Sequence, residues 1–452
     1  MSATLLAWLG IAGVLAIRSF ARPSYAVALY MLTFFAHPQF WWWGDPIEGY
    51  RWNFFSALLL IATLVLTSAG SAMKREKPLN SSAVVVLAVM AANCVLVHLL
   101  LAVNADSSFG WLIIRLKFIL LFFLLQYAIK DEKDYRIVSL AIALGMGYIG
   151  YEATINERGS FSGGRLEGVG AAGIQSSNQL ASLLITGLPL ATAVLFTTAP
   201  RWLKGVTLVA AGFTFNVVLM CNSRGAFLGV ILAGVTFIAL ASGPARKRSM
   251  KLAAVAAIGA FMLLGDARIL DRFASTFTGA SERDNSAQSR IVFWTAASRM
   301  IADYPLGSGG NSFSEGRGWQ YMSQVAVEGN TRAVHNGFLT EMTSWGVQGF
   351  AILLVLFYRI GRTILRGRRL ALDAGNTNAM MVFGCLAASM VAWLVSSFFG
   401  DYLDEEWGFW TAAMVYAYLR VHVEAPASEQ SAPPATFTPR PALPPVARRV
   451  SA

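Results

Sequence analysis

Three polar residues beside apolar runs could take part in chemistry: His335, Arg224 and Arg290. His335 stands just before an apolar run that begins at Gly337. An imidazole with an unperturbed pKa of about 6.5 is largely neutral at pH 7, as a general base requires. The alternative is an interfacial histidine that holds the end of a helix, which is the commoner role for a lone histidine. Both interpretations stay open at this point.

Arg224 lies in the segment 221–225, which joins two apolar runs with almost no loop between them. An arginine deep in a membrane costs about 2.5–3.5 kcal/mol on insertion scales, so it usually marks a function or a specific partner. Arg290 begins an amphipathic segment, where the positive end of the helix dipole would add to its charge. Guanidinium groups around one cavity suit a pyrophosphate, because each can make paired hydrogen bonds to its oxygens.

Arg115 and Lys117 are two further basic residues within an apolar run, at residues 110–129, and their charges also need an explanation. One interpretation is that they bind an anionic substrate. The other is that their long side chains snorkel towards lipid phosphates.

The composition requires membrane-spanning elements to hold these residues. The chain has 452 residues, of which 56% are hydrophobic and only 13% charged, with a mean hydropathy of +0.53. These values exclude a soluble globular enzyme and a disordered protein, and predict an integral membrane protein. The three cysteines, Cys94, Cys221 and Cys385, lie in or beside apolar runs without metal or redox spacing.

Apolar runs of about 20 residues, or slightly fewer, predict the spans, and there are about 12 of them, or 13 if every short run crosses. They cover residues 3–17, 24–37, 53–70, 82–103, 110–129, 136–152, 177–199, 205–221, 225–242, 252–265, 337–358, 380–399 and 407–421. The fold class is therefore all-α, with a polytopic membrane domain over residues 1–421.

Basic residues gather in every second loop, for example at Lys74 to Lys77 and at Arg359 to Arg369. The positive-inside rule assigns these loops to the cytoplasm and the loop 266–336 to the outside. The net charge of +11 is then a signal of orientation rather than of nucleic-acid binding. Residues 422–452 are rich in proline, alanine and serine, which predicts a disordered cytoplasmic tail.

The loop 266–336 is the one predicted external segment large enough to hold a site by itself. Residues 288–303 are predicted to form an amphipathic helix that lies on the bilayer or caps the bundle. Its expected apolar face consists of Ile291, Trp294, Ala297, Ser298 and Ile301. The glycines of segment 307–310 allow close backbone approach to a ligand, although such a stretch is more often only a turn.

Together these residues resemble the O-antigen ligase and polymerase superfamily, which includes WaaL ligases, Wzy-type polymerases and O-oligosaccharyltransferases. The resemblance rests on the following positions: Ser177 to Leu180; Ser223, Arg224 and Gly225; Arg290, Trp294, Met300, Asp303 to Gly307 and Gly309 to Phe313; and His335, Asn336, Phe338, Leu339, Glu341, Gly346 and Gly349. The opening region, with Arg18 to Pro23 and Trp41 to Trp43, is similar to the exosortase-associated O-glycosylation ligase branch.

The resemblance implies transfer of a glycan from undecaprenyl pyrophosphate to an acceptor hydroxyl of a lipid or glycan, on the periplasmic side of the bacterial inner membrane. His335 would be the base that activates the acceptor, and Arg224 and Arg290 would stabilise the pyrophosphate. Asn178 and Asn336 would contact substrate. No metal and no cofactor is expected, since the acidic residues at 401–406 lack the spacing of a known metal site.

Two alternatives remain open from the sequence. A Wzy-type polymerase, which extends the glycan on its carrier, would use the same residues. A transporter of lipid-linked or anionic solutes would instead line a path through the bilayer with charged residues, whereas here the candidate residues gather on the predicted external side.

Overall fold

The computed structural model describes residues 2–70, 81–162, 164–174, 176–243, 246–247, 249–251, 285–322 and 333–423. This part of the chain consists of helices and one short antiparallel hairpin, in which β1 (Ser160–Ser162) pairs with β2 (Arg165–Glu167). Seven helices are long and apolar enough to cross a membrane, and three shorter apolar helices accompany them. The all-α membrane class is therefore confirmed. The number of spans is not tested, because the predicted span 252–265 and the tail beyond Val423 lie outside the described residues.

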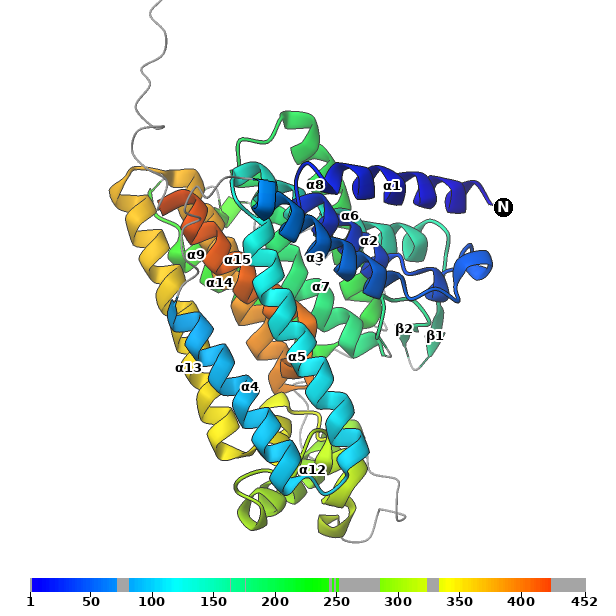
Figure 1. Ribbon diagram of the computed structural model, residues 1–452, viewed down its shortest axis with the longest axis vertical. Coiled ribbons are helices and arrows are strands. Elements are labelled where there is room, and N and C mark those ends of the chain that lie inside the picture. Colours follow the sequence, from blue (N-terminus) through cyan, green and yellow to red (C-terminus); the bar gives the residue numbers. More distant parts are fainter. Residues whose placement is uncertain are drawn as a thin grey trace, which may run out of the picture.

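The observed helices begin and end close to the predicted apolar runs (Figure 1). They are α1 (Ala3–Ser19), α2 (Ser24–Phe35), α3 (Trp52–Gly70), α4 (Ser81–Leu101), α5 (Ala105–Ala128), α6 (Glu132–Thr154), α7 (Ser177–Thr192), α8 (Arg201–Cys221), α9 (Arg224–Leu240), α12 (Asn285–Asp303), α13 (Gly337–Asp373), α14 (Thr377–Phe398) and α15 (Glu406–Val423). Short helical turns are η1 (Pro38–Phe40), η2 (Asp45–Ile47), η3 (Ala193–Phe196), η5 (Phe313–Arg317), η6 (Gly318–Tyr321) and η7 (Tyr402–Asp404).

Helix α14 forms the centre of the bundle and packs against α7, α9, α13 and α15. It is apolar on every face, from Met380 to Trp393, which is the pattern of a helix surrounded by others. Gly384 lies against the ring of Phe237 on α9, at a distance where a β-carbon would be within 3.1 Å of that ring. A larger residue at position 384 would push α14 and α9 apart.

Helix α13 is longer than the predicted span 337–358 and is broken once. It continues to Asp373 because the arginines and leucines after Tyr358 are good helix formers. The break is at Gly346, whose φ of +81° only glycine adopts readily. The glycine segment 307–310 packs into this break, and Ser308 N–H donates to the Thr343 carbonyl at 3.1 Å. Its close backbone approach is therefore to α13, which favours the interpretation as a turn.

The amphipathic helix α12 is confirmed, but its predicted apolar face is only partly the buried one, since Ala297 and Trp294 pack inside whereas Ile291 and Ser298 do not. The buried residues are Phe293, Ala296, Ala297 and Met300, which pack with Phe313, Met322 and Val334. Ile291 is 52% exposed, and Ser298 is also exposed. The helix is rotated relative to the prediction because it packs on the start of α13 and on η6, which the sequence pattern of one helix does not reveal. It caps the bundle in this way.

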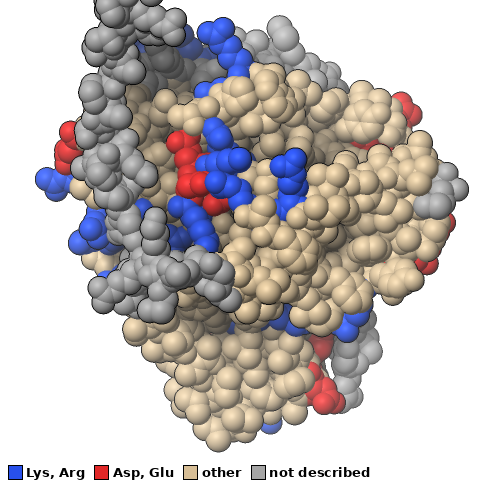
Figure 2. Space-filling view, turned by 45° about the horizontal axis from the view of Figure 1, so that its top comes forward, with Lys and Arg blue, Asp and Glu red and all other residues tan. Residues whose placement is uncertain are grey.

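Basic side chains gather at one end of the molecule. Arg359, Arg362, Arg366 and Arg369 of α13 line a surface hollow there. Figure 2, in which the upper end of Figure 1 comes forward, shows Lys and Arg side chains on this end. Helix α12 lies near the other end of α13 (Figure 1). The basic cluster and α12 therefore lie towards opposite ends of α13.

Candidate active site

Three arginines from distant parts of the chain surround one small cavity. Arg224 begins α9, Arg290 lies on α12, and Arg165 lies on strand β2. The cavity has a volume of about 40 Å³. No acidic side chain is among its lining residues, so the cavity carries a charge of +3 and is suited to an anion.

A tight reversal of the chain brings Arg224 into this position. Helix α8 ends at Cys221, and Asn222 adopts a left-handed conformation with φ of +47°. Asparagine tolerates this conformation better than other residues with a side chain. Ser223 is then the N-cap residue of α9, which begins at Arg224, so this short connection places Arg224 in the first turn of that helix. Gly225 lies against Phe399, where an added β-carbon would be only 2.9 Å from the Cβ atom of Phe399 and 3.1 Å from its ring.

The short hairpin positions Arg165. Glu167, two residues further along β2, accepts hydrogen bonds from the backbone N–H of Ser177 at 3.2 Å and from its hydroxyl at 2.8 Å. These bonds attach the hairpin to the first turn of α7. Asn178, the next residue of α7, lines the same cavity as Arg165.

The environment of Arg290 shows how closely the charges gather. Burial lowers the pKa of Arg290, and the nearby charge of Arg224 lowers this pKa further, while Tyr402 and Asp401 act in the opposite direction. An arginine nevertheless remains protonated at neutral pH. Two like charges held together in a half-buried place are a specific arrangement, which a bound anion would stabilise.

His335 lies beside this cavity rather than in its lining. It has a left-handed backbone with φ of +57°. The Asp401 carboxylate holds the turn, because it accepts the backbone N–H groups of His335 at 3.2 Å and Asn336 at 3.1 Å and the Thr340 hydroxyl at 2.5 Å. Burial raises the pKa of the Asp401 carboxyl, while these donors and the charge of His335 oppose the shift.

Two connections join His335 to the arginines. On α12, Arg290 and Phe293 are one turn apart, and the Phe293 ring lies 6.2 Å from the His335 ring. In the loop after α14, Tyr402 lines the cavity while its neighbour Asp401 binds the His335 segment. Burial raises the pKa of the Tyr402 hydroxyl, so it stays protonated and can donate a hydrogen bond to an anion.

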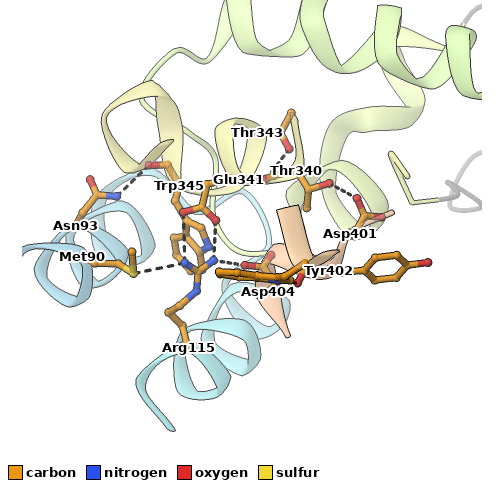
Figure 3. Close-up of polar contacts among 11 residues, drawn as sticks. Met90, Asn93, Arg115, Thr340, Glu341, Thr343, Trp345, Asp401, Tyr402 and Asp404 are labelled. Carbon is orange, nitrogen blue, oxygen red and sulfur yellow. Dashed lines mark hydrogen bonds and ion pairs between the residues drawn. The ribbon is translucent and has the colours of Figure 1, made fainter. Parts of the chain in front are cut away.

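Arg115 lies in a buried ion-pair network on another side of this loop. Its guanidinium bonds the Glu341 carboxylate at 2.7 Å and also bonds Asp404. Its side chain is only 2% exposed. Figure 3 shows Arg115 held by Glu341 and Asp404, with Thr340 linked to Asp401 nearby. Two carboxylates already pair with this charge, and Arg115 does not line the arginine cavity.

Residues 207–354 match the model of a family described as O-antigen ligase. The match runs from α8 to the middle of α13 and includes Arg224, Arg290 and His335. This segment is a domain of the O-antigen ligase family. Members of this family are membrane enzymes that act on glycans, with lipid-linked glycans as substrates in general. No curated protein matches the sequence.

In this O-antigen ligase domain and its surroundings, the other predicted site residues take different places. Asn178 lines the arginine cavity. Asn336 is buried and caps α13, since its Oδ1 atom accepts the backbone N–H groups of Phe338 and Leu339. Lys117 does not line the arginine cavity and instead lines a second cavity between α2, α3 and α5.

The site residues predicted from the sequence do not include Arg165 and Tyr402, which both line the arginine cavity. A signal for Arg165 existed: it is an arginine in the loop 153–176, which the positive-inside rule assigns to the outside, where basic residues are depleted. Tyr402 carried no such signal, because a tyrosine near a membrane boundary is ordinary. Among the described residues, no group of acidic, histidine or cysteine side chains could hold a metal ion.

Proposed function

We propose that this O-antigen ligase family member transfers a glycan from undecaprenyl pyrophosphate to an acceptor hydroxyl. The observation that carries the proposal is the convergence of Arg165, Arg224 and Arg290 on one cavity, with His335 beside it. A leaving pyrophosphate develops negative charge in the transition state. Fixed guanidinium groups stabilise that charge without having to reorganise during the reaction.

The size of the cavity suggests which part of the donor enters it. A pocket for a whole ligand typically has about 300–1,000 Å³. The arginine cavity, at about 40 Å³, has room for only part of a donor, and its charge selects the phosphate end. The glycan would then lie outside the cavity, on the side of His335.

His335 would act as the general base. Its imidazole would take the proton of the acceptor hydroxyl as the oxygen attacks the anomeric carbon. The bond from that carbon to the pyrophosphate oxygen would break, and its electron pair would leave with the pyrophosphate. This direct displacement inverts the anomeric centre. Asp401 would stabilise the imidazolium that forms, since its carboxylate lies close enough to interact with His335.

The membrane orientation follows from charge. The arginine-rich half of α13 would face the cytoplasm, and the site at the other end of α13 would face the periplasm of the bacterial inner membrane. The carrier lipid would stay in the outer leaflet. The acceptor, a lipid or a glycan, would approach from the same side.

Product analysis with purified protein tests this proposal. A ligase requires a separate acceptor and leaves free undecaprenyl pyrophosphate. A Wzy-type polymerase instead lengthens the glycan on its carrier without another acceptor, using the same residues. A transporter of lipid-linked or anionic solutes would leave the bond between glycan and pyrophosphate intact, and this outcome would refute enzymatic transfer.

A further inference from the structure

A second cavity, of about 640 Å³, lies between α2, α3 and α5 and the segment that precedes α3. One part of it is polar and is lined by His37, Glu48, Arg51 and Lys117. The other part is apolar and is formed by one face of α3 and the second half of α5. We call the charged part the mouth of the cavity. A cavity with a charged mouth and apolar walls suits an amphipathic lipid better than a water-soluble ligand.

Lys117 is the least expected residue of this cavity. It lies near the midpoint of α5, a helix that is long and apolar enough to cross a membrane, and its side chain is exposed. Within the described part of the chain, its ammonium has no hydrogen bond and no ion pair. A cation on a spanning helix is expensive unless an anion or water compensates it. The position therefore indicates an external anionic partner.

The charges at the mouth define the partner. Arg51 and Lys117 contribute two positive charges and Glu48 one negative charge, so the mouth carries a net charge of +1. The guanidinium of Arg51 lies over the Phe54 ring at 5.5 Å, which keeps it at the edge of the apolar wall. Burial lowers the pKa of His37, so this imidazole is neutral at pH 7. A single phosphodiester, with one negative charge, matches this mouth.

The apolar walls are open towards the surroundings of the helix bundle. Leu58 on α3 is 45% exposed and Leu120 on α5 is 47% exposed. These side chains can contact an acyl chain that lies between the two helices. We propose that this cavity is a binding site for an anionic phospholipid, whose phosphodiester lies between Lys117 and Arg51 and whose acyl chain lies between α3 and α5.

Comparison with two other hollows shows why we assign the second cavity a phospholipid rather than the pyrophosphate donor. The arginine cavity has a charge of +3 and no acidic residue in its lining, which suits a pyrophosphate. A groove between α6 and α8, of about 400 Å³, is lined by residues such as Leu144 and Val209 and has no charged residue in its lining. That groove can hold an acyl chain but cannot select a head group. The second cavity combines both properties, since its basic residues can bind one phosphate and its apolar walls can hold an acyl chain.

Lipid binding to the purified full-length chain tests the proposal. Native mass spectrometry would compare retention of phosphatidylglycerol, which carries one negative charge, with that of zwitterionic phosphatidylethanolamine and of undecaprenyl phosphate. We expect phosphatidylglycerol to be preferred over phosphatidylethanolamine by about fivefold for each cation, the factor for a basic residue near a lipid surface. Equal retention of these two lipids would overturn the proposal. Tighter binding of undecaprenyl phosphate would overturn the choice of a phospholipid.

Four variants locate the site. Lys117→Leu should lower the preference by about fivefold, and Lys117→Arg should keep it. Leu58→Trp should fill the apolar part and reduce phosphatidylglycerol retention, whereas Val209→Trp, at an exposed apolar position in the uncharged groove, should leave it unchanged. An unchanged preference in Lys117→Leu, or equal losses in both tryptophan variants, would overturn the assignment. None of these residues lines the arginine cavity, so the result is independent of the proposed glycan transfer.

Discussion

His335 occupies a strained position that the surrounding residues maintain. Its left-handed backbone, with φ of +57°, is uncommon for a residue other than glycine and costs some energy, although histidine adopts it more often than most residues do. The Asp401 carboxylate compensates this cost by accepting two successive backbone N–H groups, of His335 and Asn336. This backbone conformation fixes the direction in which the imidazole projects from the chain. Residues in such sparsely populated conformations cluster at functional sites.

We expect His335→Ala to abolish glycan transfer and to leave donor binding largely intact. Loss of a general base typically lowers the rate by about 10²–10⁴-fold. The measurement is initial transfer rate together with donor affinity in reconstituted membranes. A transfer rate within a few-fold of wild type would remove the assignment of His335 as the base.

The arginine cavity yields a second expectation at the scale of residues. Arg224→Ala and Arg290→Ala should each weaken donor binding, because a hydrogen bond to a charged group contributes about 1.5–3 kcal/mol. Arg299→Ala is a matched control, since Arg299 is an exposed arginine on the same helix, α12. If both cavity variants bind the donor as wild type does, the pyrophosphate would have to bind elsewhere.

Among structural elements, the segment 400–406 does most to connect the site with the bundle. Each of its four carboxylates binds a different helix: Asp401 the start of α13, Asp404 α5, Glu405 α7 and Glu406 α2. The acidic cluster that the sequence shows is therefore divided among four partners. This explains how a short segment holds Tyr402 at the cavity and Asp401 at His335.

We expect Arg115→Met to destabilise the fold strongly. Breaking a buried ion pair by removing one partner costs about 3–5 kcal/mol, because the other charge stays buried. Here two carboxylates, Glu341 and Asp404, would lose their cation. Glu341→Gln should be milder, since Asp404 would still balance Arg115. Thermal unfolding in detergent measures both variants, and the reverse order of stability would contradict this account of the network.

Glu405 gives the same segment a pH dependence. Burial raises the pKa of Glu405 to about 8, and the neighbouring carboxylates act in the same direction. An exposed glutamate has a pKa of about 4.3, so between these values the folded protein binds a proton that the unfolded chain has lost. Its contribution to stability therefore falls as the pH rises from about 4.3 to about 8.

Glu405→Gln removes this titration and keeps an acceptor for the Gln179 amide, which bonds Glu405 at 2.6 Å. The variant should match wild type in melting temperature near pH 5 and exceed it near pH 9, where the stabilising proton is absent from wild type, as linkage requires. If the difference in melting temperature between the variant and wild type stayed constant from pH 5 to pH 9, Glu405 would not titrate in this range.

The sequence predicted the elements better than their contacts. Apolar runs located α4, α5 and α14 to within a few residues, because a bilayer requires a fixed length of apolar helix. The partners of Arg115 could not be found in this way. Glu341 is 226 positions away in the chain and Asp404 is 289, so only the folded arrangement brings them together.

Parts of the candidate site were also accessible from sequence. Arg224 and Arg290 were identified separately, from a cation at a membrane boundary and a cation on an amphipathic helix, and the structure places both at one cavity. Arg165 was missed because it reaches that cavity through a hairpin whose position depends on Glu167 and Ser177. The buried face of α12 was predicted only in part for a similar reason, because its partners come from later segments.

Across the whole molecule, the site and the basic cluster lie towards opposite ends of α13. This separation gives an expectation for accessibility. The native cysteines, Cys94, Cys221 and Cys385, are all buried, so introduced cysteines can be labelled against a low background. Thr295→Cys, on the exposed side of α12, should react with an impermeant reagent from the periplasm, and Arg362→Cys should react only from the cytoplasm. Reversed labelling would overturn the orientation.

The central claim is that this molecule breaks the bond between a glycan and its lipid pyrophosphate and gives the glycan to a hydroxyl. The most direct measurement incubates the purified chain with undecaprenyl-pyrophosphate glycan and acceptor, and quantifies both products. We expect free undecaprenyl pyrophosphate and glycosylated acceptor in equal amounts from wild type, and neither from His335→Ala. Movement of the glycan with its carrier bond intact, or equal product from His335→Ala, would contradict the account.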